Sequence, residues 1–556
     1  MEPSSRQARV LLLAHASAVP GAVEAVATLA PGSEIEVLPL GRAAADTAAP
    51  EGARLIVAPG TDLGGLRTAL AAGRWLLGLR RRHYSRAVIA LADLGVNQSR
   101  GALLGIALVA GARGVVAVEP GSGRVTRRLG RPAMAADALR FAIFHAAAFA
   151  AAPVASLAID ALARVAGPQS AQLEPRSEGR VVYLRTDVEL RLSPLRAGGS
   201  LAHTLGILRA LRRRGHEVEI WTTGEVSTAA REGKERRLPV VMKGNVPREF
   251  CELLSGLAQG LRPLPLSSPP EFIYQRHSMN NLAGVLLARR WKVPLVLEAN
   301  ASEVQWREEW SSLRLPALGR ACERLILGDA ARVAAVSDNA ARHLLAAGAP
   351  PDRLRVVPNG VETERFAGAT PRELPFDRES FVIGFIGLFY PWHGVRHLAE
   401  AFPLILEACP NARLLLVGDG EDAAVVRRLL EGSGAIDRVL LPGLVPADDV
   451  PGYLLACDVL ASPHAASEGF IGSPIKIWEY MASGRAIIAS ALAQLGDVLE
   501  DERTALLVPP GDPVALAAAI IRLHGDPALR DRLGQSALEE AMAKHSWDAR
   551  LRDALE

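Results

Sequence analysis

The stretch "GSPIKIWEYMASGRAIIAS", residues 472–490, predicts a helix followed directly by a strand. Ser473 is a favourable N-cap residue, and Pro474 suits the first helical position, where its missing N–H costs nothing. Gly484 is typical of the residue that ends a helix, and the apolar run at 486–490 then predicts a buried strand. A helix that leads into a buried strand is the repeating unit of parallel α/β proteins.

The beginning of this helix carries two opposite charges three positions apart. The N–H groups and the dipole of a helix start favour an anion such as a diphosphate, and Lys476 adds an ammonium donor to them. Glu479 lies one turn later on the same face, where its carboxylate can accept both hydroxyl protons of a ribose. This order of groups matches a nucleoside diphosphate. The alternative is a solvated Lys–Glu pair of little energetic weight.

Short apolar runs alternate with helical patterns along almost the whole chain, which predicts parallel sheets covered by helices. Four strands are expected in the N-terminal part, at 8–13, 34–38, 54–58 and 87–91. This part contains no catalytic motif that we recognise, and the segment 167–179 has the composition of a linker. The pattern restarts at "RVVYLRTD" (180–187) and again at "FVIGFIGLF" (381–389). Two successive α/β units of this kind predict two sheets that face each other over a cleft.

Composition excludes several classes of protein. The 556 residues are 49% hydrophobic and 22% charged, as in an ordinary packed globular protein. A net charge of +3 is too small for nucleic acid to be the main partner. The four cysteines lack C-x-x-C spacing, which argues against a disulfide framework and a zinc site and favours a reducing cytoplasm.

Two features suggest contact with a membrane. Basic clusters occur at 80–86, 123–131 and 209–215, either as solvated helix faces or as contacts to an anionic membrane surface. The segment 141–159 has no charged residue over a length that could span a bilayer. Because it is rich in alanine and is interrupted by His145 and Pro153, we expect a buried or interfacial helix rather than a transmembrane one.

Several further motifs stand in a fixed order, and with the opening stretch they resemble the retaining glycosyltransferases of family 4, over about residues 180–550. The motifs are "AGGSLAHTLGIL" (197–208), "VVPNGVETERF" (356–366), "GFIGLFYPWHG" (384–394), "LLLVGDG" (414–420), "CDVLASP" (457–463) and "LLVPPGDPVALAAAI" (506–520). The resemblance implies the α/β GT-B architecture, in which two Rossmann-like domains face a cleft. It assigns 180–366 to the acceptor side and 367–545 to nucleotide-sugar binding. Residues 546–556 would form a helix that could cross back to the acceptor domain, and 1–170 an additional Rossmann-like α/β domain.

On the donor side, Glu479 matches the second glutamate of the family's E-x7-E motif, which holds the ribose hydroxyls. The position of the first glutamate is Ile471, and Glu468 could reach the donor sugar only if the loop is three residues longer than usual. The pattern SP-x-K-x-x-E-Y-M-A marks a subset of the family that also lacks the regular first glutamate. The resemblance therefore makes Lys476 and Glu479 the main donor-binding residues, with Gly472 and Ser473 at the helix start.

The loop after the strand at 381–386 departs from the family at its phosphate-binding Arg/Lys pair. Leu388 stands near the arginine position, and His393 stands where lysine is usual, so His393 either donates to the phosphate or is an ordinary loop histidine. Gly387 and Gly394 would allow close backbone approach. The resemblance also places two residues, Leu444 and Val445, where the backbone reads the base.

On the acceptor side, Gly198 and Gly199 precede a helix start, as in the family's glycine loop, although Gly-Gly is also an ordinary turn. Arg276 follows one predicted strand and could contact phosphate or acceptor, or form an ion pair with Glu298. Asn300 joins Glu298 near the place where many family members have a functional histidine. His203 is expected to pack in an apolar helix face rather than to act in catalysis.

These features lead to the hypothesis of a retaining glycosyltransferase. It would move a sugar from a UDP- or GDP-linked donor to a glycan, lipid-linked or other acceptor, without a cofactor and without a protein-held metal. Lys476, the helix start and His393 would stabilise the departing diphosphate. A nucleotide-sugar epimerase on the same scaffold and a non-catalytic binding subunit are the alternatives. We expect a cytoplasmic protein attached to the inner face of the membrane.

Overall fold

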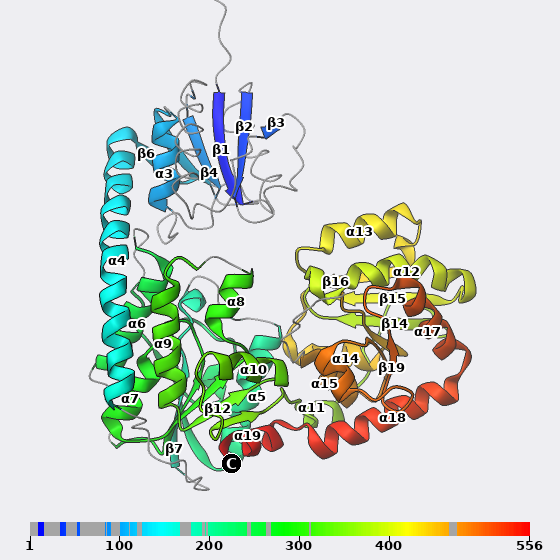
Figure 1. Cartoon of the computed structure of the whole chain (residues 1–556). Helices are drawn as coiled ribbons and strands as arrows, with labels where there is room; N and C mark the ends of the chain where they lie inside the picture. The colour runs from blue at the N-terminus through cyan, green and yellow to red at the C-terminus, as the bar shows by residue number, and fades with distance from the viewer. Residues whose placement is uncertain are drawn as a thin grey trace, which may run out of the picture. The chain divides into compact units, whose positions relative to one another are not determined.

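The structure is a computed structural model, shown in Figure 1. It describes residues 9–15, 34–40, 53–55, 84, 86–90, 100–110, 112–118, 125–166, 179–191, 195, 198–241, 246–262, 268–310, 313–465 and 475–556. By their internal contacts the residues form two compact units. The first comprises Met1–Ala155 with Val241–Leu254, and the second comprises Ser156–Val240 with Ser255–Glu556. The described strands form three sheets.

The first unit contains a six-stranded sheet with the order β3-β2-β1-β4-β5-β6. Its strands are β1 (Arg9–His15), β2 (Glu34–Leu40), β3 (Ala53–Leu55), β4 (Arg86–Ala90), β5 (Gly114–Val118) and β6 (Val125–Gly130). Neighbouring strands are parallel except for the last pair, β5 and β6, which is antiparallel. Leu11 and Leu13 of the central strand pack with Leu104 of helix α3 (Arg100–Val109) in the core.

The second unit begins with a seven-stranded parallel sheet, here called the β7 sheet, with the order β13-β12-β11-β10-β7-β8-β9. Its strands are β7 (Gly179–Arg185), β8 (His216–Thr222), β9 (Lys234–Arg237), β10 (Phe272–Arg276), β11 (Leu295–Ala299), β12 (Arg332–Ala335) and β13 (Leu354–Val356). The described helices of this part include α5 (Gly199–Arg213), α7 (Ala283–Trp291), α8 (Glu303–Trp310), α9 (Pro316–Asp329) and α10 (Asp338–Ala346). Helix α6 (Arg248–Leu261) begins in the first unit and ends in the second. The central strand β7 is an apolar run, as expected of a strand that is covered on both faces.

A second parallel sheet, the β14 sheet, follows in the same unit with the order β16-β15-β14-β17-β18-β19. Its strands are β14 (Phe381–Ile386), β15 (Ala412–Val417), β16 (Val439–Gly443), β17 (Val459–Ser462), β18 (Ala486–Ser490) and β19 (Leu506–Val508). Alternate residues of β14 belong to different cores. Ile383 and Phe385 pack with helices α12 (Val395–Ala408) and α17 (Pro513–Gly525), whereas Val382 and Ile386 pack with α14 (Val450–Leu455) and α15 (Ile475–Ala482). The three sheets confirm the predicted α/β fold class.

The C-terminal helix α19 (Trp547–Leu555) follows α18 (Pro527–Lys544) and packs on the β7 sheet, beside α5. Trp547, Leu551 and Leu555 are buried in the same core as β7 and β8. A Cβ atom at Gly206 of α5 would lie 2.2 Å from Nε1 of Trp547, so only glycine leaves room for the indole. The chain therefore leaves the β14 sheet and ends on the β7 sheet.

The segment 141–159 lies inside a single 36-residue helix, α4 (Arg131–Ala166). Among the described residues, α4 is the one helix that is long and apolar enough to cross a bilayer. Only 28% of its most apolar window is buried.

Candidate active site

Lys476 lies on the first turn of α15 and points into the protein. The residue is only 8% exposed, and its Nζ atom has no hydrogen-bond partner among the described residues. Nζ lies 4.6 Å from the centroid of the Phe385 ring, at the end of β14. Burial lowers the pKa of Lys476 to about 7. Residues 466–474, which contain the predicted Glu468, Gly472 and Ser473, lie outside the described residues.

A buried cation without an anionic partner is costly, and proteins retain such groups mainly where a ligand completes them. The ring of Phe385 offers a cation–π contact, which offsets part of the lost hydration. It cannot accept the three N–H bonds that an ammonium donates. Within the part of the chain that the structure describes, the N–H groups of Lys476 therefore remain without acceptors.

Two histidines lie near this ammonium. The rings of His393 and His464 are 5.6 Å apart, and burial together with the charge of Lys476 lowers the pKa of both, to about 3 for His393. Nδ1 of His393 lies 2.6 Å from the carbonyl oxygen of Leu388, which fixes Nδ1 as the protonated nitrogen. Nε2 of the neutral ring is then an acceptor. His393 can donate to a phosphate only when Nε2 is protonated as well, a state that the negative charge of a bound phosphate favours.

Glycines shape the backbone around Lys476. A Cβ atom at Gly394 (φ +66°) would lie 1.8 Å from the carbonyl oxygen of Pro463, so the loop after β14 can approach β17 only with glycine there. A Cβ atom at Gly387 would lie 3.8 Å from Cδ of Lys476. Gly387 thus lies beside the lysine, and Gly394 follows His393 in the same loop and packs against Pro463.

Glu479 lies one turn along α15 from Lys476, with 17% of its side chain exposed. Burial raises its pKa to about 7, and the opposing effect of Arg365 is smaller. Nη1 of Arg365, on α11 (Glu364–Ala367), lies 3.9 Å from Oε1 of Glu479. Arg365 was present in a motif quoted from the sequence, but its partner could not be read from spacing. Leu444 is 58% exposed just after β16, and Val445 beside it is partly buried against the core of α14 and α15.

A cavity lies at the carboxyl ends of three strands of the β7 sheet, where ligands of α/β proteins usually bind. Its volume is about 190 Å³, and it is lined by Arg185, Asp187, Leu190, Arg276, His277, Asn300 and Glu303. Arg276 and Asn300 were predicted from the sequence. Arg185, Asp187 and Glu303 were missed, although the polar "RTD" that ends β7 was a signal for the first two.

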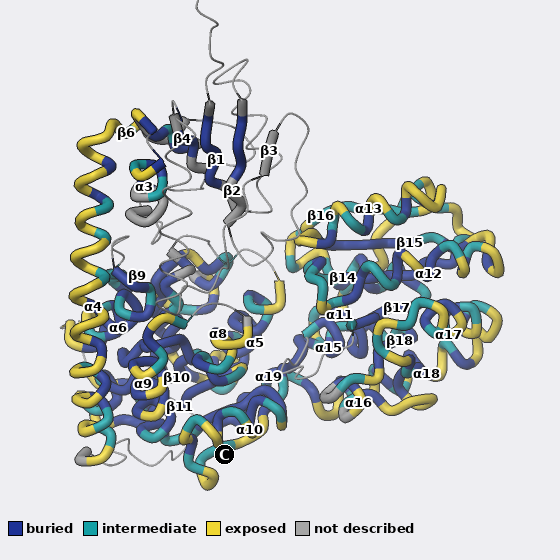
Figure 2. The backbone as a smooth tube through the Cα atoms, turned by 45° about the horizontal axis from the view of Figure 1, so that its top comes forward, coloured by how far each residue is buried: buried dark blue, intermediate teal, exposed yellow. Residues whose placement is uncertain are grey.

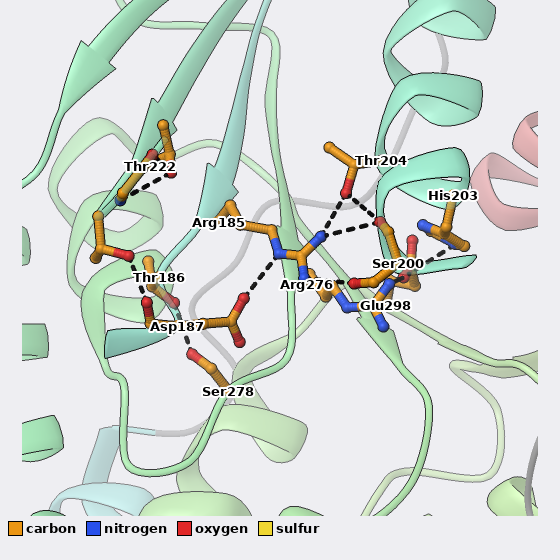
Figure 3. A network of polar contacts seen from close by, with 12 residues as sticks. Arg185, Thr186, Asp187, Ser200, His203, Thr204, Thr222, Arg276, Ser278 and Glu298 are labelled. Atoms are coloured by element: carbon orange, nitrogen blue, oxygen red, sulfur yellow. Dashed lines mark hydrogen bonds and ion pairs between the residues drawn. The ribbon is translucent and has the colours of Figure 1, made fainter. Parts of the chain in front are cut away.

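Arg185 connects the end of β7 to the glycine loop (Figure 3). Its Nε donates to Oδ2 of Asp187 at 2.7 Å, and its Nη2 donates to Oγ of Ser200 at 2.8 Å. Nη1 donates to the hydroxyl of Thr204, one turn into α5. The guanidinium thereby orients the Asp187 carboxylate and the beginning of α5 together.

Arg276 forms the ion pair with Glu298 that was one of its predicted interactions: its Nη1 lies 3.3 Å from Oε1 of Glu298 (Figure 3). Glu298 is buried and also accepts from the hydroxyl of Tyr274 at 2.9 Å and contacts Nε2 of His203 at 3.1 Å. Burial raises the pKa of Glu298 and lowers that of His203 well below its usual value. His203 packs edge-on against Trp547, which fits a packed rather than a catalytic histidine. Glu298 does not line the cavity, but it pairs with Arg276, which does.

The glycine loop contacts the residues that flank Lys476. Cβ atoms at Gly198 (φ +85°) and Gly199 would lie 3.7 Å from Cδ1 of Leu388 and 3.6 Å from Cδ1 of Ile475, respectively. Gly198 is the N-cap of α5, and Ile475 directly precedes Lys476. A Cβ atom at either position would be in ordinary van der Waals contact, and it is the φ of +85° at Gly198 that favours glycine in the loop.

Glu303 begins α8 at the wall of the cavity. Burial raises its pKa to about 7, and the nearby Asp187 raises it further, while His277 and Arg307 lower it. Its backbone N–H donates to Glu323 at 2.7 Å, which holds the start of the helix. No group of three or more His, Cys, Asp or Glu side chains among the described residues is arranged to hold a metal ion.

Comparison with known proteins gives matches over both sheets of the second unit. Residues 197–365 match the family model described as Glycosyltransferase Family 4, and residues 380–526 match the model described as Glycosyl transferases group 1. The 2-deoxystreptamine glucosyltransferase of Streptomyces kanamyceticus is 31% identical over 278 residues, which are 48% of this chain and 68% of that enzyme. The D-inositol 3-phosphate glycosyltransferase of Acidothermus cellulolyticus is 27% identical over 386 residues, or 63% of this chain and 83% of that enzyme.

Solved structures show the same architecture. Anabaena HepE in complex with UDP-glucose superposes with a TM-score of 0.51 at 19% identity, covering 68% of this chain and 98% of that one. Sucrose-phosphate synthase from Thermosynechococcus elongatus gives a TM-score of 0.52 at 22% identity, covering 68% and 97%. These likenesses confirm the predicted fold of two Rossmann-like domains.

Proposed function

The chain belongs to the glycosyltransferases of family 4 and has their GT-B fold, and we propose that its donor is a nucleoside-diphosphate sugar bound at Lys476. The observation that carries this proposal is the buried ammonium of Lys476, which has no hydrogen-bond partner among the described residues. A diphosphate supplies the anionic oxygens that the described surroundings of Nζ lack. Glu479, one turn away and mostly buried, can accept from the ribose hydroxyls. The donor is UDP- or GDP-linked, and HepE, which shares this fold, is known with UDP-glucose.

In the proposed reaction, the bond between the sugar and the diphosphate breaks while an acceptor hydroxyl attacks from the same face, and the proton of that hydroxyl passes to an oxygen of the departing diphosphate. Negative charge grows on the diphosphate as it leaves, and Lys476 stabilises that charge at a site with little water. The ammonium supplies this charge without a metal ion, so we propose that activity survives chelation by EDTA. We assign no catalytic base, and His393 acts on the phosphate only in its protonated form.

The acceptor is proposed to bind in the cavity at the carboxyl edge of the β7 sheet. A volume of about 190 Å³ is below the range of about 300–1,000 Å³ that is typical of drug-sized ligands, and it suits one small polyhydroxylated ring. Asp187 and Glu303 can accept from hydroxyl groups, and Asn300 can both donate and accept. A glycan or lipid-linked acceptor would place its terminal sugar there.

The test is a donor screen with purified protein and radiolabelled UDP- and GDP-sugars, with and without acceptors. Transfer to an acceptor with the donor's anomeric configuration supports the proposal. Consumption of donor at the same rate without any acceptor indicates the epimerase, and tight binding without turnover indicates the binding subunit. In either case the proposal is wrong.

A further inference from the structure

Helix α4 exposes an apolar face of unusual size for a globular protein. Of the seventeen large hydrophobic side chains that are exposed among the described residues, seven lie on this helix. They are Leu139, Ile143, Phe144, Phe149, Val154, Leu157 and Leu162. Most of the positions between them are alanines, and Figure 2 shows α4 exposed along its length. An exposed patch of this kind usually marks a contact with a partner protein or a membrane.

The opposite face of α4 packs against the protein. Ala148 is buried with Val246 and Cys251 in one small core. Nearer the C-terminal end, Oδ1 of Asp160 accepts from Nη2 of Arg324 at 2.7 Å. A helix that crossed a bilayer over 141–159 would lose the packing of Ala148 in this core, so we treat α4 as a surface helix despite its length.

The basic and the acidic residues of α4 differ in how far they are exposed. Its three arginines, Arg131, Arg140 and Arg164, are all exposed. Its two acids are both paired: Oδ1 of Asp137, a residue 8% exposed, lies 3.8 Å from Nη1 of Arg140, and Asp160 pairs with Arg324. The exposed surface of the helix is therefore apolar along its middle and cationic near both ends.

This charge pattern decides between the two candidate occupants. Two copies of α4 packed in parallel would place each arginine near its own equivalent, and antiparallel packing would bring Arg131 near Arg164. Neither arrangement offers an exposed acid of α4 to pair with them. Anionic lipid phosphates pair with arginine, and the acyl region accepts the apolar side chains between.

We propose that the exposed face of α4 lies on the surface of a bilayer that contains anionic lipids. The apolar side chains enter the boundary between headgroups and acyl chains, and the long arginine side chains reach up to the phosphates. The helix holds the enzyme at the membrane without spanning it. This attachment is independent of the identity of the donor or acceptor.

Co-sedimentation of the full-length protein with vesicles tests the proposal. The wild type should sediment with vesicles of phosphatidylcholine and phosphatidylglycerol at low salt, and more weakly with phosphatidylcholine alone. A Val154→Glu, Leu157→Glu double variant should partition at least tenfold less, because two carboxylates would enter the apolar boundary. The control is Val514→Glu, at an exposed position of α17 that is 67% exposed, and it should sediment like the wild type.

Thermal unfolding of both variants establishes that they are folded. If the folded wild type stays in the supernatant at low salt, or the α4 variant sediments equally well, the proposal is wrong. It is also overturned if light scattering shows a dimer that the α4 variant abolishes, or if alkaline carbonate fails to release the protein from membranes.

Discussion

Replacing Lys476 by methionine should make the free protein more stable and the donor complex much weaker. Methionine keeps the length of the side chain and its contact with Phe385 but removes the charge. The fall in the pKa of Lys476 from 10.5 to about 7 corresponds to about 5 kcal/mol against the charged form. Losing the cation–π contact offsets about 0.5–2 kcal/mol of this, so we expect a net gain in the free energy of unfolding of about 3–4.5 kcal/mol at pH 7.

The pH dependence gives the sign of this effect. Because the folded pKa of Lys476 is lowered, the unfolded chain binds more protons between about pH 7 and 10.5, and wild-type stability rises with pH across that window. The variant lacks this dependence. Its advantage in unfolding temperature should be largest near pH 7 and should shrink as the pH approaches 10.

The affinity for the donor should fall in Lys476→Met, although the free protein becomes more stable. A charge-assisted hydrogen bond to the diphosphate contributes about 1.5–3 kcal/mol, so its loss should weaken binding about 10- to 150-fold in isothermal titration with the preferred nucleotide sugar. Lys544→Met is the matched control, because the Lys544 side chain is 65% exposed. Lys544→Met should change neither the free energy of unfolding nor the affinity for the donor. A Lys476→Met protein that is less stable than the wild type and binds donor normally would refute the reasoning.

Three further changes test other parts of the site. Donor affinity should peak near pH 7 and fall on both sides, because Lys476 must be protonated and Glu479 ionised, and both pKa values are about 7. In Glu479→Gln the fall in donor affinity on the acidic side should vanish. Gly394→Ala should lower the free energy of unfolding, measured by chemical denaturation, by about 2–4 kcal/mol, because its Cβ atom would clash with a backbone carbonyl. The control is Gly432→Ala, which has open space around it and should change the same free energy by less than about 1 kcal/mol. Asp187→Asn should lower kcat/KM for the acceptor at least about tenfold and leave the donor Kd within about twofold; equal losses for both substrates would remove Asp187 from the acceptor site.

The sequence predicted the fold class because the apolar runs of the central strands are uninterrupted. β7, β14 and β18 are each buried between helices, and their periodicity is visible without the structure. Lys476 and Glu479 could also be predicted from the sequence, because a helix start and a spacing of one turn are local properties.

The acceptor cavity was harder to predict because it depends on contacts between distant segments. Asp187 gains its position from Arg185, which in turn is held by Ser200 and Thr204 of another element. The raised pKa of Glu303 comes from its burial and, in smaller part, from Asp187 and Glu323, which are distant in the sequence. Nor could the sequence distinguish the two faces of α4, because alanines occupy both, and only packing determines which of them is covered.

A structure of the protein with a bound nucleotide sugar tests the central claim most directly. The account predicts that diphosphate oxygens lie within hydrogen-bonding distance of Nζ of Lys476 and that the ribose hydroxyls contact Glu479. A nucleotide bound elsewhere, with the Lys476 ammonium still buried and unpartnered, would contradict it.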